Sequence, residues 1–173
     1  MTATLSKKDL SPAMFEAVHL LTKRKVLVGF PKSTDERDPV ATKQGKKVSR
    51  PTSSKPAITN AALAYIHDQG SPLQGIPQRE FMRPGIMDGR DKITPQLLRA
   101  GRASMRGDKL GVEAGLMGAG LAGQAAIRHK ITDGPFVPLK PATLAARKRR
   151  GVSRTKPLID TAQMRNAVTF IVE

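Results

Sequence analysis

Apolar residues recur at helical spacing in several stretches of the chain. Met14, Val18 and Leu21 fall on one stripe after the capping pair Ser11-Pro12, so we expect a helical arm within residues 1–24. The same spacing, together with capping residues, predicts further helices over residues 60–69, 95–105 and 109–131.

Extended chain is expected in three places. Pro72 prevents the helix before it from continuing, so residues 71–86 are predicted to form a turn and an extended exit. Residues 25–30 and 168–172 are apolar and β-branched, which predicts two strands. With one or two more strands between them, we expect an α+β fold in which a small antiparallel or mixed β-sheet is covered by two or three α-helices.

Residues 32–57 show no apolar period and are rich in Gly, Ser, Thr and Pro, with no acidic residue after Asp38. We therefore expect a long, mobile, basic loop. It is either a solvated insertion or a segment that becomes ordered on a neighbouring subunit or on DNA. The remaining sequence predicts a single domain over residues 25–173.

Charge is the strongest compositional feature of the chain. A formal net charge of +16 favours a polyanionic neighbour, either nucleic acid or an acidic protein surface. The absence of cysteine excludes a disulfide framework. The longest apolar run, residues 110–127, is interrupted by Glu113 and Gln124, so no membrane contact is expected.

The sequence predicts no enzyme, no cofactor and no metal site. Residues 118–123 satisfy G-x-G-x-x-G, but they lie inside a helical pattern with no strand before them, so close helix packing is the better interpretation. The three histidines are too scattered for a metal centre. His67-Asp68 has no accompanying nucleophile motif, which favours a structural role for His67.

A dense basic run follows a short predicted helix near residue 145. It comprises Arg147, Lys148, Arg149 and Arg150. No aromatic residue is interleaved with it, so base stacking is disfavoured, and non-specific contact with phosphate or with an acidic neighbour is expected.

Two motifs, N-x-x-x-A-x-x-H-D-Q-G over residues 60–70 and I-P-Q-R-E-F-M-R-P over residues 76–84, resemble a known family. It comprises the small neck proteins of tailed bacteriophages, called tail-completion, tail-terminator or head–tail connector proteins. The chain departs from that pattern at Asp68, where Glu is usual, at Gln69 and at Glu80. The matching residues are Asn60, Ala64, His67, Gly70, Ile76, Pro77, Arg79, Phe81, Arg83 and Pro84.

The last third of the chain is similar to the same family. Ala162 replaces a usual Gly and Ala167 a usual Ser. Asp160 or Thr161 is expected to cap a short helix before the closing strand. The matching residues are Leu139, Thr143, Arg147, Gly151, Lys156, Pro157, Leu158, Asp160, Thr161, Met164 and Val168.

The resemblance implies a structural virion protein, assembled in the host cytoplasm, that forms a ring of six or twelve subunits where the DNA-filled head joins the tail. Its partners would be neighbouring neck, connector or tail-tube proteins, with possible non-specific contact with packaged DNA. The alternative, from charge alone, is a basic non-specific nucleic-acid-binding protein.

Candidate residues follow from both lines of reasoning. Phe81 is expected to be a buried anchor between two arginines. The assembly candidates are His67, Arg79, Phe81, Arg83, Asp160 and Thr161, and the basic contact candidates are Lys43, Lys46, Lys47, Arg50, Arg147, Lys148, Arg149 and Arg150.

Overall fold

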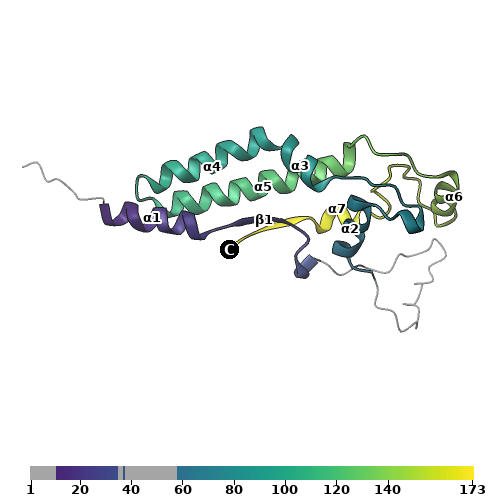
Figure 1. Ribbon diagram of the computed structural model, residues 1–173, viewed down its shortest axis with the longest axis horizontal. Helices are drawn as coiled ribbons and strands as arrows, with labels where there is room; N and C mark the ends of the chain where they lie inside the picture. The colour runs from purple at the N-terminus through teal and green to yellow at the C-terminus, as the bar shows by residue number, and fades with distance from the viewer. Residues whose placement is uncertain (1–10, 35–36, 38–57) are drawn as a thin grey trace, which may run out of the picture.

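The computed structural model describes residues 11–34, 37 and 58–173, and these form an elongated body (Figure 1). Of the predicted basic loop, it describes only a 3-10 helix, Lys32–Thr34, and Arg37. The rest of that loop lies outside the described residues, together with the candidates Lys43, Lys46, Lys47 and Arg50.

A helical hairpin forms the long axis of the body. It consists of α4 (Arg90–Ser104) and α5 (Lys109–Asp133), which lie side by side (Figure 1). Asp108 caps α5, because its Oδ1 accepts a hydrogen bond from the Gly111 amide at 2.8 Å. The helices approach closely at Gly115, where a Cβ would lie 2.7 Å from the Ala100 backbone nitrogen. The predicted close packing of the α5 glycines is thus confirmed.

α4 begins five residues earlier than predicted. Pro95 was expected in its first turn, but the helix starts at Arg90 and contains Pro95. Proline lacks the N–H that would bond to the carbonyl of Asp91, so the helix continues with one hydrogen bond missing near its start.

The sheet has two strands, β1 (Val26–Gly29) and β2 (Thr169–Val172), which pair antiparallel. Both lie within a residue or so of the predicted strands. α5 covers one face: added Cβ atoms at Gly120 and Gly123 would meet Phe170 and Val28, which face each other across the two strands. In the described part of the chain the expected further strands do not form, and only an isolated bridge pairs Ser71 with Ile76.

The N-terminal helix α1 (Ser11–Lys23) packs against the hairpin, with Ala17 fully buried. Its buried neighbours are small or aliphatic, namely Ala100, Ala103, Val112 and Leu116. The described part of the predicted arm is therefore held in the body by this cluster.

The other end of the molecule is built from four short helices: α2 (Asn60–Gln69), α3 (Met82–Asp88), α6 (Pro141–Arg149) and α7 (Gln163–Ala167). The predicted cap of α2 is confirmed, because Thr59 Oγ1 accepts from the Ala62 amide. Phe81 is fully buried in a cluster with Ile127, Ile131 and Val168. The expected burial of Phe81 is also confirmed.

Two local predictions at this end were wrong. Residues 82–88 form α3 and do not continue the extended exit. Neither Asp160 nor Thr161 caps α7, whose N-cap is Ala162 with no side-chain cap. Ala162 has φ 64°, a left-handed conformation that costs an L-residue about 1–2 kcal/mol. Position 162 is where the resemblance leads one to expect Gly, which adopts this conformation freely.

α5 is the one helix of the described chain that is long and apolar enough to cross a membrane by length and composition. Eight of its residues, including Val112, Leu116, Ile127 and Ile131, are buried within the body. A central core helix of a folded domain passes the same test.

Candidate functional site

A cavity of about 270 Å³ lies between α2, α6 and the segment of residues 157–164. His67 comes from α2, Arg147 from α6 and Arg150 from just beyond the end of α6. Asp160 and Thr161 come from the segment of residues 157–164. The fold therefore brings five of the sequence-predicted site residues together around one space.

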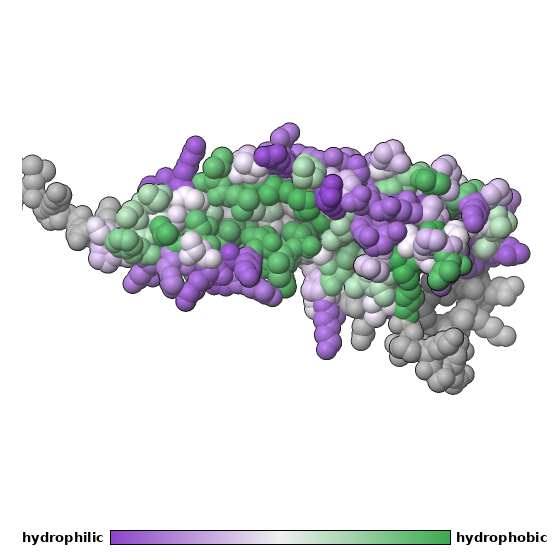
Figure 2. Space-filling model, viewed as in Figure 1, coloured by the Kyte–Doolittle hydropathy of each residue, from purple (hydrophilic) through white to green (hydrophobic). Residues whose placement is uncertain are grey.

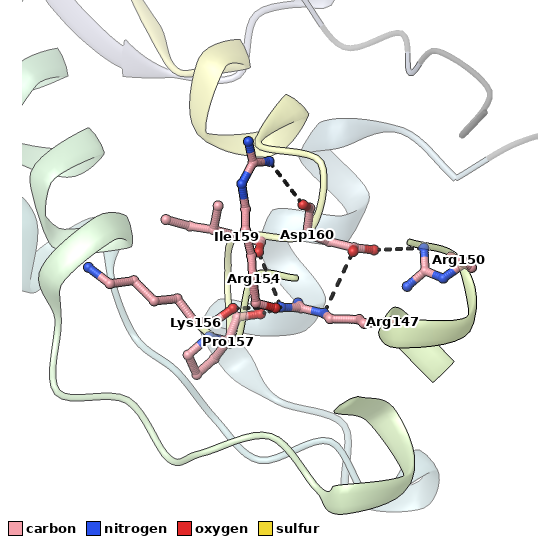
Figure 3. Close-up of polar contacts among 7 residues, drawn as sticks. All are labelled: Arg147, Arg150, Arg154, Lys156, Pro157, Ile159 and Asp160. Atoms are coloured by element: carbon pink, nitrogen blue, oxygen red, sulfur yellow. Dashed lines mark hydrogen bonds and ion pairs between the residues drawn. The ribbon is translucent and has the colours of Figure 1, made fainter. Parts of the chain in front are cut away.

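Arg147 organises the wall of this cavity (Figure 3). Its Nη1 donates to the carbonyl oxygens of Arg154, Lys156 and Ile159 at 2.8–3.1 Å, and its Nη2 donates to the Pro157 carbonyl at 3.0 Å. A guanidinium presents five N–H donors in a fixed fork, so a single side chain can hold four carbonyls of an irregular loop. Residues 154–159 thus take their path from Arg147.

Arg147 is one of the residues predicted to make non-specific contact with phosphate or with an acidic neighbour, and the structure places it inside the body. The residue is only 5% exposed, and burial is the main cause that lowers its pKa from the ordinary arginine value. Three of the four residues in the basic run lie inside α6 and not after it. Lys148 and Arg149 are the exposed members of the run.

Asp160 is held by two arginines. Its Oδ2 accepts from Arg150 Nη1 at 3.0 Å, and its Oδ1 lies 3.6 Å from Arg147 Nε (Figure 3). The backbone carbonyl of Asp160 also accepts from Arg154 Nη1 at 3.2 Å. The carboxylate therefore joins α6 to the segment that precedes α7, which is a different role from the predicted helix cap.

His67 faces a cationic environment. Its Nδ1 is buried and has no hydrogen-bond partner within the described chain. Burial lowers the pKa of His67, and the charges of Arg79, Arg147 and Arg37 lower it further. His67 is therefore neutral at pH 7, with an unused ring nitrogen.

Asp68, next to His67, has a structural role that the sequence did not reveal. Its Oδ1 accepts from the amides of Phe81 and Met82 at 2.8 and 3.0 Å. Those amides open α3, so the carboxylate caps a helix from outside it and complements the positive helix end. This contact explains why α3 forms where extended chain was predicted. No local spacing could show it, because the cap is 13 residues away.

The other candidates from the I-P-Q-R-E-F-M-R-P segment do not line the cavity. Arg79 is 5% exposed and donates from Nε to the Val137 carbonyl at 3.1 Å, while its amide donates to the His67 carbonyl. Burial is the main cause that lowers the pKa of Arg79, and the charge of Arg147 adds to it. Arg83 has an 86% exposed side chain, 4.0 Å from Glu80. Only Arg83 of these is free to contact another molecule.

The described residues contain no group of three or more His, Cys, Asp or Glu side chains arranged to hold a metal ion. The cavity is lined by apolar side chains and by several guanidinium groups. Such an arrangement suits binding of a small anionic group.

No protein-family model, curated protein or solved structure matches this chain.

Proposed function

We propose that this chain is a structural virion protein of a tailed bacteriophage, which forms a ring of subunits at the head–tail junction and joins the DNA-filled head to the tail. The sequence motifs around His67 and Asp160 support this by their resemblance to neck proteins. The structural observation that carries the proposal is a large apolar surface on the hairpin.

α5 exposes a second apolar stripe beside its buried one. Leu110, Met117 and Leu121 are 79%, 53% and 57% exposed, and with Ala114 and Ala125 they recur every three or four residues. Hydrophobic residues gather over the middle of the body, where α4 and α5 lie (Figures 1 and 2). A helix that is apolar on nearly all sides is normally buried, so another surface is expected to cover this one.

The sheet provides a separate apolar surface. Leu27 and Ile171 are paired across β1 and β2 and are 45% and 41% exposed on the face turned away from α5. A two-stranded sheet is marginal alone and leaves both edges unpaired. A closed ring needs two different surfaces on each subunit, one for each neighbour. The α5 stripe and the outer sheet face meet that requirement.

A second candidate function is non-specific nucleic-acid binding, which one observation favours. Lys92, Arg99 and Arg102 are exposed and fall on one side of α4, and Arg106 is exposed just beyond the helix end. From residue 92 to residue 106 this stripe spans about 21 Å at the helical rise. Such a stripe can follow a phosphate backbone, whereas sequence readout would need further groups.

The test of the proposed function is removal of this protein from its phage, followed by electron microscopy of the lysate. A neck ring acts after packaging, so full heads are expected beside unjoined tails. Tails of abnormal length would place the ring on the tail tube, and tails of normal length with heads that leak DNA would place it on the head side. Joined virions at normal titre would reject the proposal.

A further inference from the structure

The cavity between α2 and α6 is lined by both apolar and polar side chains. Leu63, Leu139 and Met164 contribute apolar surface, and Arg37, His67 and Arg150 contribute polar groups. Its volume of about 270 Å³ is close to the lower limit of small-molecule pockets, so it fits a group of a few heavy atoms. An occupant is expected to combine a short apolar portion with a polar head.

The charge around the cavity is unbalanced. Three guanidiniums, those of Arg37, Arg147 and Arg150, face one carboxylate, that of Asp160, and His67 is neutral. Burial is the main cause that lowers the pKa of Arg37 and of Arg147, so their charged forms lack part of their hydration. An anion in the cavity would compensate for this loss.

Two arginines retain donors that face no acceptor among the described contacts. Arg147 donates to four carbonyls from Nη1 and Nη2, with its Nε 3.6 Å from Asp160 Oδ1, whereas Arg150 uses only Nη1, on Asp160. Arg37 uses only Nη1, on Asn60 Oδ1 at 3.3 Å. Among the described residues, His67 Nδ1 is buried without a hydrogen-bond partner, and so is Asp160 Oδ1, which lies 3.6 Å from Arg147 Nε. Buried polar atoms in native proteins almost always have partners, so an unmatched group beside free arginine donors indicates a missing ligand.

We infer that this cavity binds an aliphatic carboxylate, with the carboxylate between Arg37, Arg150 and His67 and the stem against Leu63, Leu139 and Met164. Guanidiniums bind carboxylates through strong charge-assisted hydrogen bonds. The apolar wall disfavours a free phosphate, whose remaining oxygens would lose hydration against it. The carboxylate can belong to a small acid or to an acidic side chain of another protein. This inference holds whether or not the chain forms a neck ring.

The test is NMR of the His67 imidazole in the full chain, titrated with propionate, with its neutral isostere propionamide and with inorganic phosphate. Propionate is expected to give saturable shifts and to raise the pKa of His67, because it places a negative charge beside the ring. Propionamide and phosphate should give neither saturable shifts nor a raised pKa of His67. Equal binding of propionamide or phosphate, or no saturable shift with propionate, would overturn the inference.

A second NMR titration, with the blocked tripeptide acetyl-Gly-Glu-Gly-amide, distinguishes the two sources of the carboxylate. Binding as tight as that of propionate assigns the cavity to an acidic side chain of a protein. Binding of propionate alone assigns it to a small free acid. Both results support the aliphatic carboxylate.

Two variants locate the binding in this cavity. Arg37→Gln is expected to weaken propionate binding by about tenfold or more, the effect of losing one charge-assisted hydrogen bond. Arg149→Gln, an exposed neighbour on α6, should leave it unchanged. Arg150→Gln serves as a second test if its thermal melting matches that of the parent chain. Equal affinity in all three variants would overturn the assignment.

Discussion

The two ends of this molecule are held together by different interactions. At the α1 end, α4 and α5 meet through small and aliphatic residues such as Ala100, Ala103 and Gly115. At the α6 end, side chains with charged groups fix irregular backbone: Arg147 holds four carbonyls and Asp68 holds two amides. Regular helices satisfy their own backbone, whereas loops need partners from elsewhere. The difference shows where charge in a basic sequence is structural.

Arg147 and its neighbours illustrate this most directly. Arg147 and Lys148 are adjacent in one basic run, but Arg147 is buried and Lys148 is exposed. Net charge alone therefore overstates the number of cations available to a partner.

Substitution of Arg147 is expected to give the largest effect. Arg147→Met leaves four carbonyls without their donor and removes one of the two cations beside Asp160, so the free energy of unfolding should fall by about 3–5 kcal/mol. Arg147→Lys keeps the charge but not the planar guanidinium, and should lose less stability than Arg147→Met. Urea unfolding followed by circular dichroism measures both.

Lys148→Met is the matched control, because Lys148 is an exposed cation on the same helix. It is expected to change stability by less than about 0.5 kcal/mol. Equal losses for Arg147→Met and Lys148→Met would show that the loop does not depend on Arg147.

Two glycine substitutions in the hairpin test the packing at the α1 end. A Cβ at Gly115 would lie 2.7 Å from the Ala100 backbone nitrogen, whereas a Cβ at Gly101 would meet nothing within 4 Å. Gly115→Ala should therefore destabilise the chain by about 1–3 kcal/mol through overpacking. Gly101→Ala should stabilise it by about 0.5–1 kcal/mol through helix propensity. Thermal melting measures both variants. Melting temperatures that shift in the same direction would contradict the close contact between α4 and α5.

The smallest expected effect is a pH dependence from His67. Its pKa in the folded chain is lowered by burial and by three arginines. Protonation of His67 therefore favours the unfolded chain. Its contribution to the free energy of unfolding is fully present above the ordinary histidine pKa of about 6.5 and is lost as the pH falls below that value.

Urea midpoints at pH 7.5 and 5.5 measure this contribution. His67→Gln should lose less stability on acidification than the parent chain. His19→Gln, which changes an exposed histidine on α1, should behave like the parent. If the parent and His67→Gln lost the same stability between pH 7.5 and 5.5, His67 would not contribute to the pH dependence.

Sequence periodicity predicted the regular part of the fold well. The positions of α1, α2, α5 and both strands follow from apolar spacing, capping residues and Pro or Gly at the ends. α3 was missed because its cap, Asp68, comes from a distant helix, and the start of α4 was missed because Pro95 was taken as a first-turn residue. Local rules do not include contacts between distant segments.

The candidate site was predicted in part. Four of its residues were named from the family motifs and Arg150 from the basic run, but their convergence on one cavity depends on how α2, α6 and the segment before α7 pack. Arg37, which completes the cationic wall, gave no sequence signal, because it lies in a stretch without periodicity. The buried state of Arg147 was likewise invisible among its basic neighbours.

The central claim is that the exposed apolar stripe of α5 is covered by another copy of the chain. Native mass spectrometry of the purified protein measures this directly, with Leu121→Glu as the variant and Leu73→Glu, a fully exposed site in the 3-10 helix Pro72–Gln74, as the control. We predict a closed oligomer for the parent chain and for Leu73→Glu, and monomers for Leu121→Glu, because a buried carboxylate without a partner disfavours the interface. A monomeric parent chain at all concentrations, or an oligomer unchanged by Leu121→Glu, would contradict the claim.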